Sequence, residues 1–174
     1  MFTLLTGGAR SGKSTAAVRL AERAGAPVTF IATATAGDDE MADRIRRHRE
    51  DRPADWATLE EPVALAAAVG GVDSDATVVV DCLALWVTNQ LDADDHDVLA
   101  RAEELAGVLA ARSGTSLVVT NEVGLGIVPV NDVARRFRDL LGSVNRLVAA
   151  RADRTLLCVA GGVVPVHDLG ALDA

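Results

Sequence analysis

The chain has 174 residues, a hydrophobic fraction of 49% and a formal net charge of −8. The length fits a single domain, residues 1–174, with a substantial core, and the apolar content excludes a disordered chain. The acidic balance disfavours a nucleic-acid-binding protein, and no apolar run reaches the length of a membrane span.

The first predicted unit is a strand, a glycine-rich loop and a helix. Residues 2–5 read as a short buried strand and residues 14–24 as a helix. Between them stands the phosphate-binding pattern G-x-x-x-x-G-K-[ST], formed by Gly7, Gly8, Ala9, Arg10, Ser11, Gly12, Lys13 and Ser14. The backbone N–H groups of such a loop surround phosphate oxygens, and the helix start adds positive potential. Lys13 is the only lysine among 17 basic residues, which indicates a site that needs a compact ammonium.

The next elements are a β-branched strand at residues 28–33 and an arginine-rich helix that runs from residue 38 to about residue 50. A loop at residues 53–62 and a short alanine-rich helix at residues 62–70 follow. Residues 77–81 form a strand that is apolar without alternation and therefore buried on both faces. It ends in Asp81, which we expect to hold Mg²⁺ together with the Ser14 hydroxyl.

The second half predicts a connection or helix start at residues 86–95, a helix at 97–111 with Val98, Ala102, Leu105 and Leu109 on one face, and a strand at 116–120. A loop at 121–130 leads into the clearest helix, residues 131–151, whose apolar stripe is Val133, Phe137, Leu140, Leu141, Val144, Leu147 and Val148. A strand at 155–160, ended by Gly161 and Gly162, precedes a short, loose tail. Strands alternate with helices, which predicts an α/β fold with a doubly wound, mainly parallel sheet. Ligands of such folds bind beyond the carboxyl ends of the strands, where the phosphate loop, Asp81 and Asn121 would lie.

The two cysteines, Cys82 and Cys158, lie far apart in apolar runs. This favours buried thiols of a reducing compartment over a disulfide or a metal site. Because no charged-then-apolar leader opens the sequence, we expect a cytoplasmic protein.

The phosphate loop by itself does not distinguish a motor, a switch or a kinase. The N-K-x-D sequence with which switch GTPases read guanine is absent, and the chain length favours a small-molecule phosphotransferase. Its cationic clamps could come from arginines 44–52 or from Arg135, Arg136 and Arg138, although both clusters could equally be solvated helix faces. His48 lies among arginines, which favour a neutral imidazole able to attack phosphorus, but an exposed helical histidine is more often idle.

Several ordered motifs carry a more specific signal. They are the phosphate loop, Ile31-Ala32-Thr33, Asp39-Glu40-Met41, Arg44-Ile45 with His48, Arg52-Pro53, Trp56, Thr58, Glu60, Asp81-Cys82-Leu83, Leu85-Trp86-Val87-Thr88-Asn89, Val119 to Pro129, and Arg136-Phe137-Arg138-Asp139. With these motifs the chain resembles the bifunctional adenosylcobinamide kinase / adenosylcobinamide-phosphate guanylyltransferase family of cobalamin biosynthesis. The resemblance runs from residue 1 to about residue 160, and departs from the family's usual pattern at Ala84 and Val130.

The resemblance implies a RecA-like P-loop fold, a homotrimer, and two reactions. A nucleoside triphosphate, ATP or GTP, phosphorylates adenosylcobinamide, and GTP then transfers GMP to that phosphate through a guanylyl-histidine. His48 matches the histidine, with Lys13 as the second catalytic residue, and Mg²⁺ is the implied metal. The matching nucleotide-binding residues are the phosphate loop, Ala32, Thr33, Ala34, Arg49, Glu50, Asp51, Arg52, Glu60 and Asp81. The alternatives are a plain P-loop small-molecule kinase and a non-catalytic nucleotide-binding regulator.

Overall fold

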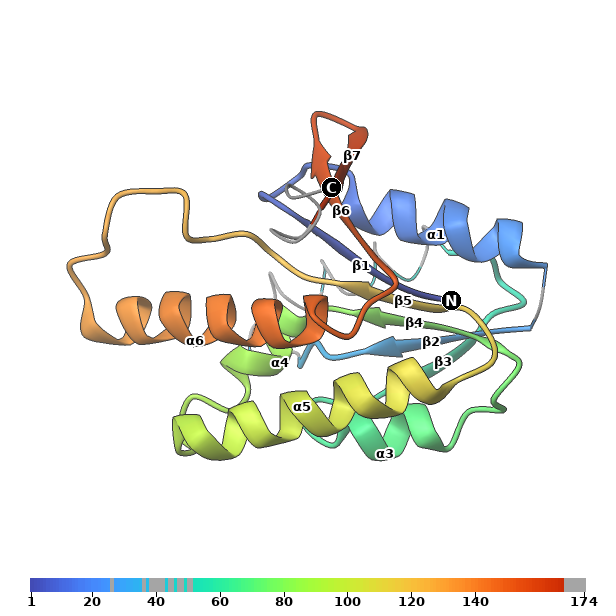
Figure 1. Ribbon diagram of the computed structural model, residues 1–174, viewed down its shortest axis with the longest axis horizontal. Helices are drawn as coiled ribbons and strands as arrows, with labels where there is room; N and C mark the ends of the chain where they lie inside the picture. Colours follow the sequence, from blue (N-terminus) through green and yellow to red (C-terminus); the bar gives the residue numbers. More distant parts are fainter. Residues whose placement is uncertain are drawn as a thin grey trace.

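The computed structural model describes residues 1–25, 27–35, 37, 43, 46, 49 and 52–167. These residues form a seven-stranded sheet in the order β3-β2-β4-β5-β1-β6-β7, parallel throughout except for the antiparallel pair β6–β7 (Figure 1). The strands are β1 (Phe2–Gly7), β2 (Val28–Ala32), β3 (Ala57–Glu60), β4 (Thr77–Asp81), β5 (Ser116–Val119), β6 (Arg154–Val159) and β7 (Gly162–Val166). The predicted mainly parallel α/β sheet is therefore confirmed.

Helices cover both faces of this sheet. Helix α1 (Lys13–Ala24) lies on one face, and Figure 1 shows α3 (Leu65–Gly70), α4 (Leu83–Thr88), α5 (Asp95–Ala111) and α6 (Asp132–Ala149) on the other. The central strands are apolar along their whole length, since Val78, Val79 and Val80 of β4 and Leu117 and Val118 of β5 are fully buried. Continuous apolar runs of this kind suit strands that are covered on both sides.

Three elements differ from the sequence prediction. Residues 57–60, predicted as loop, form the edge strand β3, whose residues are all exposed. Residues 162–166, predicted as a loose tail, form β7, a second edge strand. Both lack the buried apolar pattern from which strands are recognised, because only one side of an edge strand is paired. Residues 83–88 form the short helix α4, earlier than the predicted connection at 86–95.

The turn between β6 and β7 explains why the last hairpin was missed. Val159 and Gly162 are register partners, so Ala160 and Gly161 form a two-residue loop. Both residues have positive φ, 49° and 80°, which is the geometry of a type I′ hairpin turn. Gly161 was predicted to end the last strand, and in the structure the chain reverses at this residue and continues as β7.

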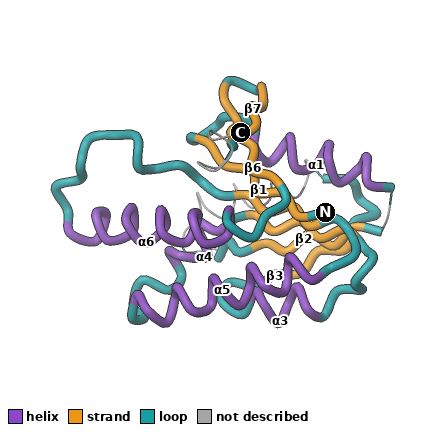
Figure 2. Tube along the Cα trace, in the orientation of Figure 1, coloured by secondary structure: helices purple, strands orange, loops and turns teal. Residues whose placement is uncertain are grey.

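Two long helices pack as their periodicity predicted, with one exception. Val98, Ala102, Leu105 and Leu109 of α5 are buried, as are Leu140, Leu141, Val144 and Val148 of α6. Val133, which the prediction placed on the apolar stripe of α6, is 60% exposed. Figure 2 shows why: the first turns of α6 and the long loop that precedes them lie beyond the end of the sheet.

Both cysteines are buried and free, as predicted. None of the helices in the part of the chain that the structure describes is long and apolar enough to cross a membrane. Most of the predicted helix at residues 38–50 lies outside the described residues.

Candidate active site

The phosphate loop joins the carboxyl end of β1 to the start of α1. Gly7 has φ 147° and Gly12 has φ 97°, conformations that side chains disfavour. A Cβ added to Gly7 would lie 2.3 Å from the Cys158 carbonyl oxygen. The loop is held from two neighbouring strands, because the Glu122 N–H donates to the Gly7 carbonyl and the Gly161 N–H donates to the Ser11 carbonyl.

The start of α1 is suited to an anion. Gly12 precedes the helix in a left-handed conformation, no side chain caps the first N–H groups, and the first turn contains no acidic residue. Lys13 is only 7% exposed, and its Nζ lies 2.7 Å from the Gly8 carbonyl oxygen, to which it donates. The ammonium charge is therefore fixed inside the loop, where phosphate oxygens would enter.

Three of the predicted nucleotide-binding residues lie side by side across the sheet. Ala32 at the end of β2 is the register partner of Glu60 on β3 and of Asp81 on β4.

Arg52 is half-buried, with its guanidinium 3.5 Å from the centre of the Phe30 ring. Burial lowers the pKa of Arg52, and the negative charges of Asp81 and Glu60 partly oppose that shift. Arg52 thus supplies a held positive charge beside the two carboxylates.

Thr33 locks the ends of β2 and β4 together. Its fully buried hydroxyl donates to the Cys82 carbonyl at 2.7 Å and accepts from the Cys82 N–H at 2.8 Å. Its own N–H donates to the Asp81 carbonyl, and its carbonyl accepts from Asn89 Nδ2. Every polar group of Thr33 is therefore used within the protein, so this residue orients the loop that leads to Ala34 and presents no side chain to a ligand.

Helix α4 and the residue that caps its end, Asn89, also support the loop that follows β3. Asn89 Nδ2 also donates to the Pro62 carbonyl, and the Trp86 indole N–H donates to the Val63 carbonyl at 2.7 Å. The loops that follow β2 and β3 are thereby fastened to one short helix.

Three cavities meet at the first turn of α1, and Thr15 lines all of them. The phosphate cavity, about 340 Å³, is lined by the loop residues from Ala9 to Ser14 together with Asp81 and Asn121. A second cavity of about 390 Å³ lies between α1 and β2 and contains Ser14, Glu22, Arg52 and Asp81. A third of about 380 Å³ lies between α1 and the β6–β7 hairpin.

The donor atoms around the phosphate cavity fit Mg²⁺. Ser14 and Asp81 line both the phosphate cavity and the second cavity, and they offer hydroxyl and carboxylate oxygens. Mg²⁺ prefers oxygen ligands and usually takes only one or two from the protein, with the rest from water and substrate phosphates. Accordingly, no cluster of three or more metal-binding side chains is found among the described residues.

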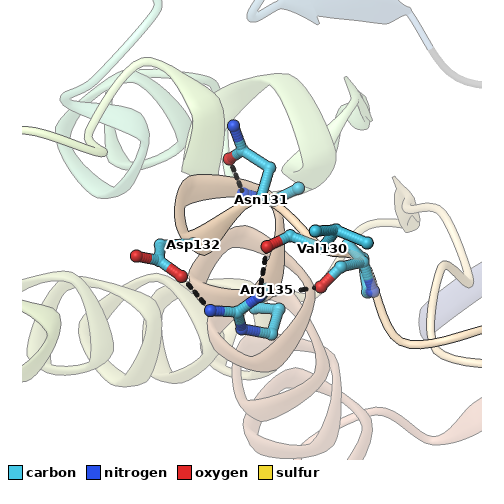
Figure 3. A network of polar contacts seen from close by, with 6 residues as sticks. Val130, Asn131, Asp132 and Arg135 are labelled. Carbon is cyan, nitrogen blue, oxygen red and sulfur yellow. Dashed lines mark hydrogen bonds and ion pairs between the residues drawn. The ribbon is translucent and has the colours of Figure 1, made fainter.

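The structure describes only part of the predicted histidine-containing segment. Arg49 is exposed; its carbonyl accepts from the Arg52 N–H and its charge contributes to lowering the Arg52 pKa, while His48, Glu50 and Asp51 lie outside the described residues. The second arginine cluster serves the fold. Arg135 donates to the Pro129 and Val130 carbonyls and pairs with Asp132, as Figure 3 shows.

The other two arginines of that cluster are also occupied on α6. Arg136 donates to the Leu91 and Ala93 carbonyls and pairs with Asp95, and Arg138 pairs with Asp139. None of the three lines the phosphate cavity, and their bonds to backbone carbonyls and carboxylates give them a structural role on half-buried positions of α6.

Sequence reasoning missed Thr15, Arg19 and Phe30, which line the cavities beside the loop. The signal for the first two was present: residues three to four positions apart on a helix share a face, so Thr15 and Arg19 continue the line that begins at Gly12. Phe30 carried no such signal, because a buried aromatic residue on a strand looks like any other core residue.

Comparisons with known proteins agree with this geometry. The model of the family described as cobinamide kinase / cobinamide phosphate guanyltransferase matches residues 3–166. The chain is 46% identical over 168 residues to the bifunctional adenosylcobalamin biosynthesis protein CobP of Pseudomonas aeruginosa, with 95% of this chain and 97% of that protein covered. It is 42% identical to the bifunctional adenosylcobalamin biosynthesis protein CobU of Salmonella typhimurium, with coverage of 92% and 97%.

Solved structures of lower identity show the fold. The RadB recombinase has a TM-score of 0.51 at 16% identity, covering 90% of this chain and 73% of its own. The flagellar accessory protein FlaH from Methanocaldococcus jannaschii has a TM-score of 0.50 at 13% identity, covering 93% and 74%. The predicted RecA-like P-loop fold is confirmed.

Proposed function

Because the chain belongs to the cobinamide kinase / cobinamide phosphate guanyltransferase family, we propose that its one phosphate loop serves both of the family's reactions. The enzyme phosphorylates cobinamide and transfers a guanylyl group to the resulting phosphate, in cobalamin biosynthesis. The family favours this reading over a kinase without nucleotidyl transfer and over a non-catalytic regulator. The observation that carries the proposal is the convergence of Lys13, Arg52 and Asp81 on two adjoining cavities at the start of α1.

In the kinase step, the aminopropanol hydroxyl oxygen of adenosylcobinamide attacks the γ-phosphorus of ATP or GTP. The bond from the γ-phosphorus to the bridging oxygen breaks, the nucleoside diphosphate leaves, and the hydroxyl proton is released. Lys13 and the N–H groups of residues 8–14 stabilise the charge that spreads over the phosphoryl oxygens. Since Lys13 is already held in the loop at 2.7 Å from Gly8, little reorganisation accompanies the reaction.

Ser14 and Asp81 are the residues that would hold Mg²⁺, on the evidence of their oxygen donors and shared cavities. When bound, the ion neutralises phosphate charge. The negative charge of Asp81, at the end of β4, partly opposes the lowering of the Arg52 pKa by burial.

In the guanylyl step, His48 is the proposed nucleophile, on the basis of the sequence resemblance. A ring nitrogen attacks the α-phosphorus of GTP and pyrophosphate leaves, which forms a phosphorus–nitrogen bond. An oxygen of the corrinoid phosphate then attacks the same phosphorus, and breaking that bond returns His48 and yields adenosylcobinamide-GDP. Ala32, Ala34, Arg49, Glu50, Asp51, Arg52 and Glu60 are proposed to bind this nucleotide, with Thr33 positioning them.

The proposal includes a single catalytic domain, residues 1–174, that acts in the cytoplasm as a homotrimer. Two buried free thiols, Cys82 and Cys158, agree with a reducing compartment. The trimer rests on the family resemblance.

The experiment incubates the protein with Mg²⁺ and with GTP labelled first at the α-phosphate and then at the γ-phosphate, without adenosylcobinamide when label on the protein is measured and with it when phosphorylation is measured. We expect acid-labile label to remain on denatured protein from the α position only, and to be lost in His48→Ala. The γ-label should transfer to adenosylcobinamide in both proteins. Absence of protein-bound α-label, with corrinoid phosphorylation intact, would refute the guanylyl-histidine.

A further inference from the structure

The cavity between α1 and the β6–β7 hairpin has no role in the site described so far. It measures about 380 Å³, which lies within the range of small-molecule sites. One end is formed by Gly12 of the phosphate loop and by Gly161 of the hairpin turn. The cavity therefore opens directly from the place where phosphates bind.

Its long wall is one face of α1. The lining residues Gly12, Thr15, Ala16, Arg19, Leu20 and Arg23 recur at helical spacing. From the first to the last the wall runs about 16 Å, at 1.5 Å per residue. The cavity on the β2 side of α1 shares Thr15 and Arg19 with this one and adds Ser14, Val18 and Glu22, so the two spaces lie on adjoining faces of the helix and are separated by the line of Thr15 and Arg19.

The chemistry of the two spaces differs. The hairpin-side cavity has an apolar floor of Ala16, Leu20, Leu156 and Val163, and its only charged lining residues are two arginines. The cavity on the β2 side contains the carboxylates of Glu22 and Asp81 beside its arginines. An apolar floor with guanidinium groups beside it suits a nucleobase, because guanidinium planes stack on aromatic rings.

The hairpin is fixed relative to the phosphate loop. The Gly161 N–H donates to the Ser11 carbonyl at 3.0 Å, and a Cβ on Gly12 would lie 3.2 Å from the Gly161 Cα. A triphosphate held by the loop therefore has the hairpin-side floor at a constant position beside it.

We propose that this cavity holds the purine nucleoside of the phosphate donor during the kinase step, whereas the guanosine of the guanylyl step occupies the cavity lined by Arg52 and Asp81. This proposal rests on the two-reaction function proposed above. One loop thus binds the triphosphate in both reactions, and the side of α1 on which the nucleoside lies differs between them.

The test compares two neighbouring residues of β7. Val163 lines the cavity and is 51% exposed, and Val164, with its side chain on the other face of the strand, is 55% exposed. In Val163→Trp the indole would fill the cavity, whereas Val164→Trp places the same group outside it. GTP serves as the probe in both reactions, with γ-label followed into adenosylcobinamide and α-label followed into the protein.

For Val163→Trp we expect the KM for GTP as phosphate donor to rise at least tenfold. The KM for self-guanylylation, which is the GTP concentration that gives half the maximal rate of protein labelling, should change less than twofold. Val164→Trp should change neither KM by more than twofold. Equal effects of the two variants would overturn the proposal, as would a rise of both KM values to the same extent in Val163→Trp.

Photolabelling with 8-azido-ATP gives a readout that does not depend on turnover. We expect ATP-competed label in the peptide that contains residues 154–166, because residues 13–24 border both cavities, and we expect that label to be lost in Val163→Trp. Label confined to residues 28–60 would place the donor nucleoside on the other side of α1 and contradict the proposal. If the wild-type protein phosphorylates no corrinoid, the proposed function fails, and the photolabel still decides where a purine nucleotide binds.

Discussion

Two fully buried threonines give a sharp test of how the sheet is held: Thr33 lies at its active-site edge, and Thr77 begins β4 at the opposite edge. The Thr33 hydroxyl makes two hydrogen bonds to the Cys82 backbone, whereas the Thr77 hydroxyl is buried without a hydrogen-bond partner among the described residues. Thr→Val removes the hydroxyl from each and keeps the shape nearly unchanged. We therefore expect the two substitutions to change the free energy of unfolding in opposite directions.

The magnitudes follow from what is left behind. Thr33→Val leaves the buried Cys82 N–H unsatisfied, while the Cys82 carbonyl still accepts from the Trp86 N–H, so we expect a loss of roughly 1–3 kcal/mol. For a chain of this length, 3 kcal/mol lowers Tm by about 6–12 °C. Thr77→Val removes a buried hydroxyl with no compensating bond, and we expect a gain of about 1 kcal/mol.

Urea unfolding followed by far-ultraviolet circular dichroism measures both changes. Thr33→Ser, which keeps the hydroxyl, is the control and should lose less stability than Thr33→Val. The reasoning fails if Thr33→Val lies within about 0.5 kcal/mol of the wild type, or if both valine variants shift in the same direction.

Three further substitutions or treatments test the site. Gly7→Ala would place a methyl group 2.3 Å from the Cys158 carbonyl and should abolish nucleotide binding in a titration calorimeter while circular dichroism stays native; normal affinity would contradict the required loop conformation. Arg52→Lys keeps the charge but loses the planar stack on Phe30, so the KM for GTP in guanylyl transfer should rise about tenfold, which corresponds to about 1.4 kcal/mol. Burial raises the pKa of Cys82 to about 11, so about 0.1% is thiolate at pH 8; alkylation by iodoacetamide should be slow there in native protein, rise with pH towards 11, and be fast at pH 8 only after unfolding in urea.

The sequence predicted the parts of the fold that depend on continuous local signals. The phosphate motif, the buried strand ending in Asp81 and the buried face of α5 all appear where their patterns placed them. Edge strands β3 and β7 could not be recognised, because every residue of each is exposed. Strand β3 exists because it pairs with β2, which is distant in sequence. Strand β7 exists because it pairs with β6, after a turn that local composition did not reveal.

The site was predicted less completely than the fold for a related reason. Asp81 and Glu60 were identified by motif, but their alignment on either side of Ala32 is a property of strand register. Thr33 was expected to bind nucleotide, and its side chain instead joins β2 to β4. The direction of a side chain in three dimensions decides whether a residue contacts a ligand or supports a neighbouring residue. Motif spacing does not encode that direction.

The strand order explains why one phosphate loop has a cavity on each side. Strand β1 lies inside the sheet, with β5 on one side and β6 on the other, and α1 packs over β1, β4 and β5 on its way towards β2. One flank of α1 therefore faces the β2 side, where Phe30 and Arg52 lie, and the other faces the β6–β7 hairpin. Had β1 been an edge strand, the second flank would have met solvent and no hairpin-side cavity would exist. A central β1 followed by a crossing helix provides two walls beside a single set of phosphate-binding N–H groups, and the proposal above assigns one wall to each reaction.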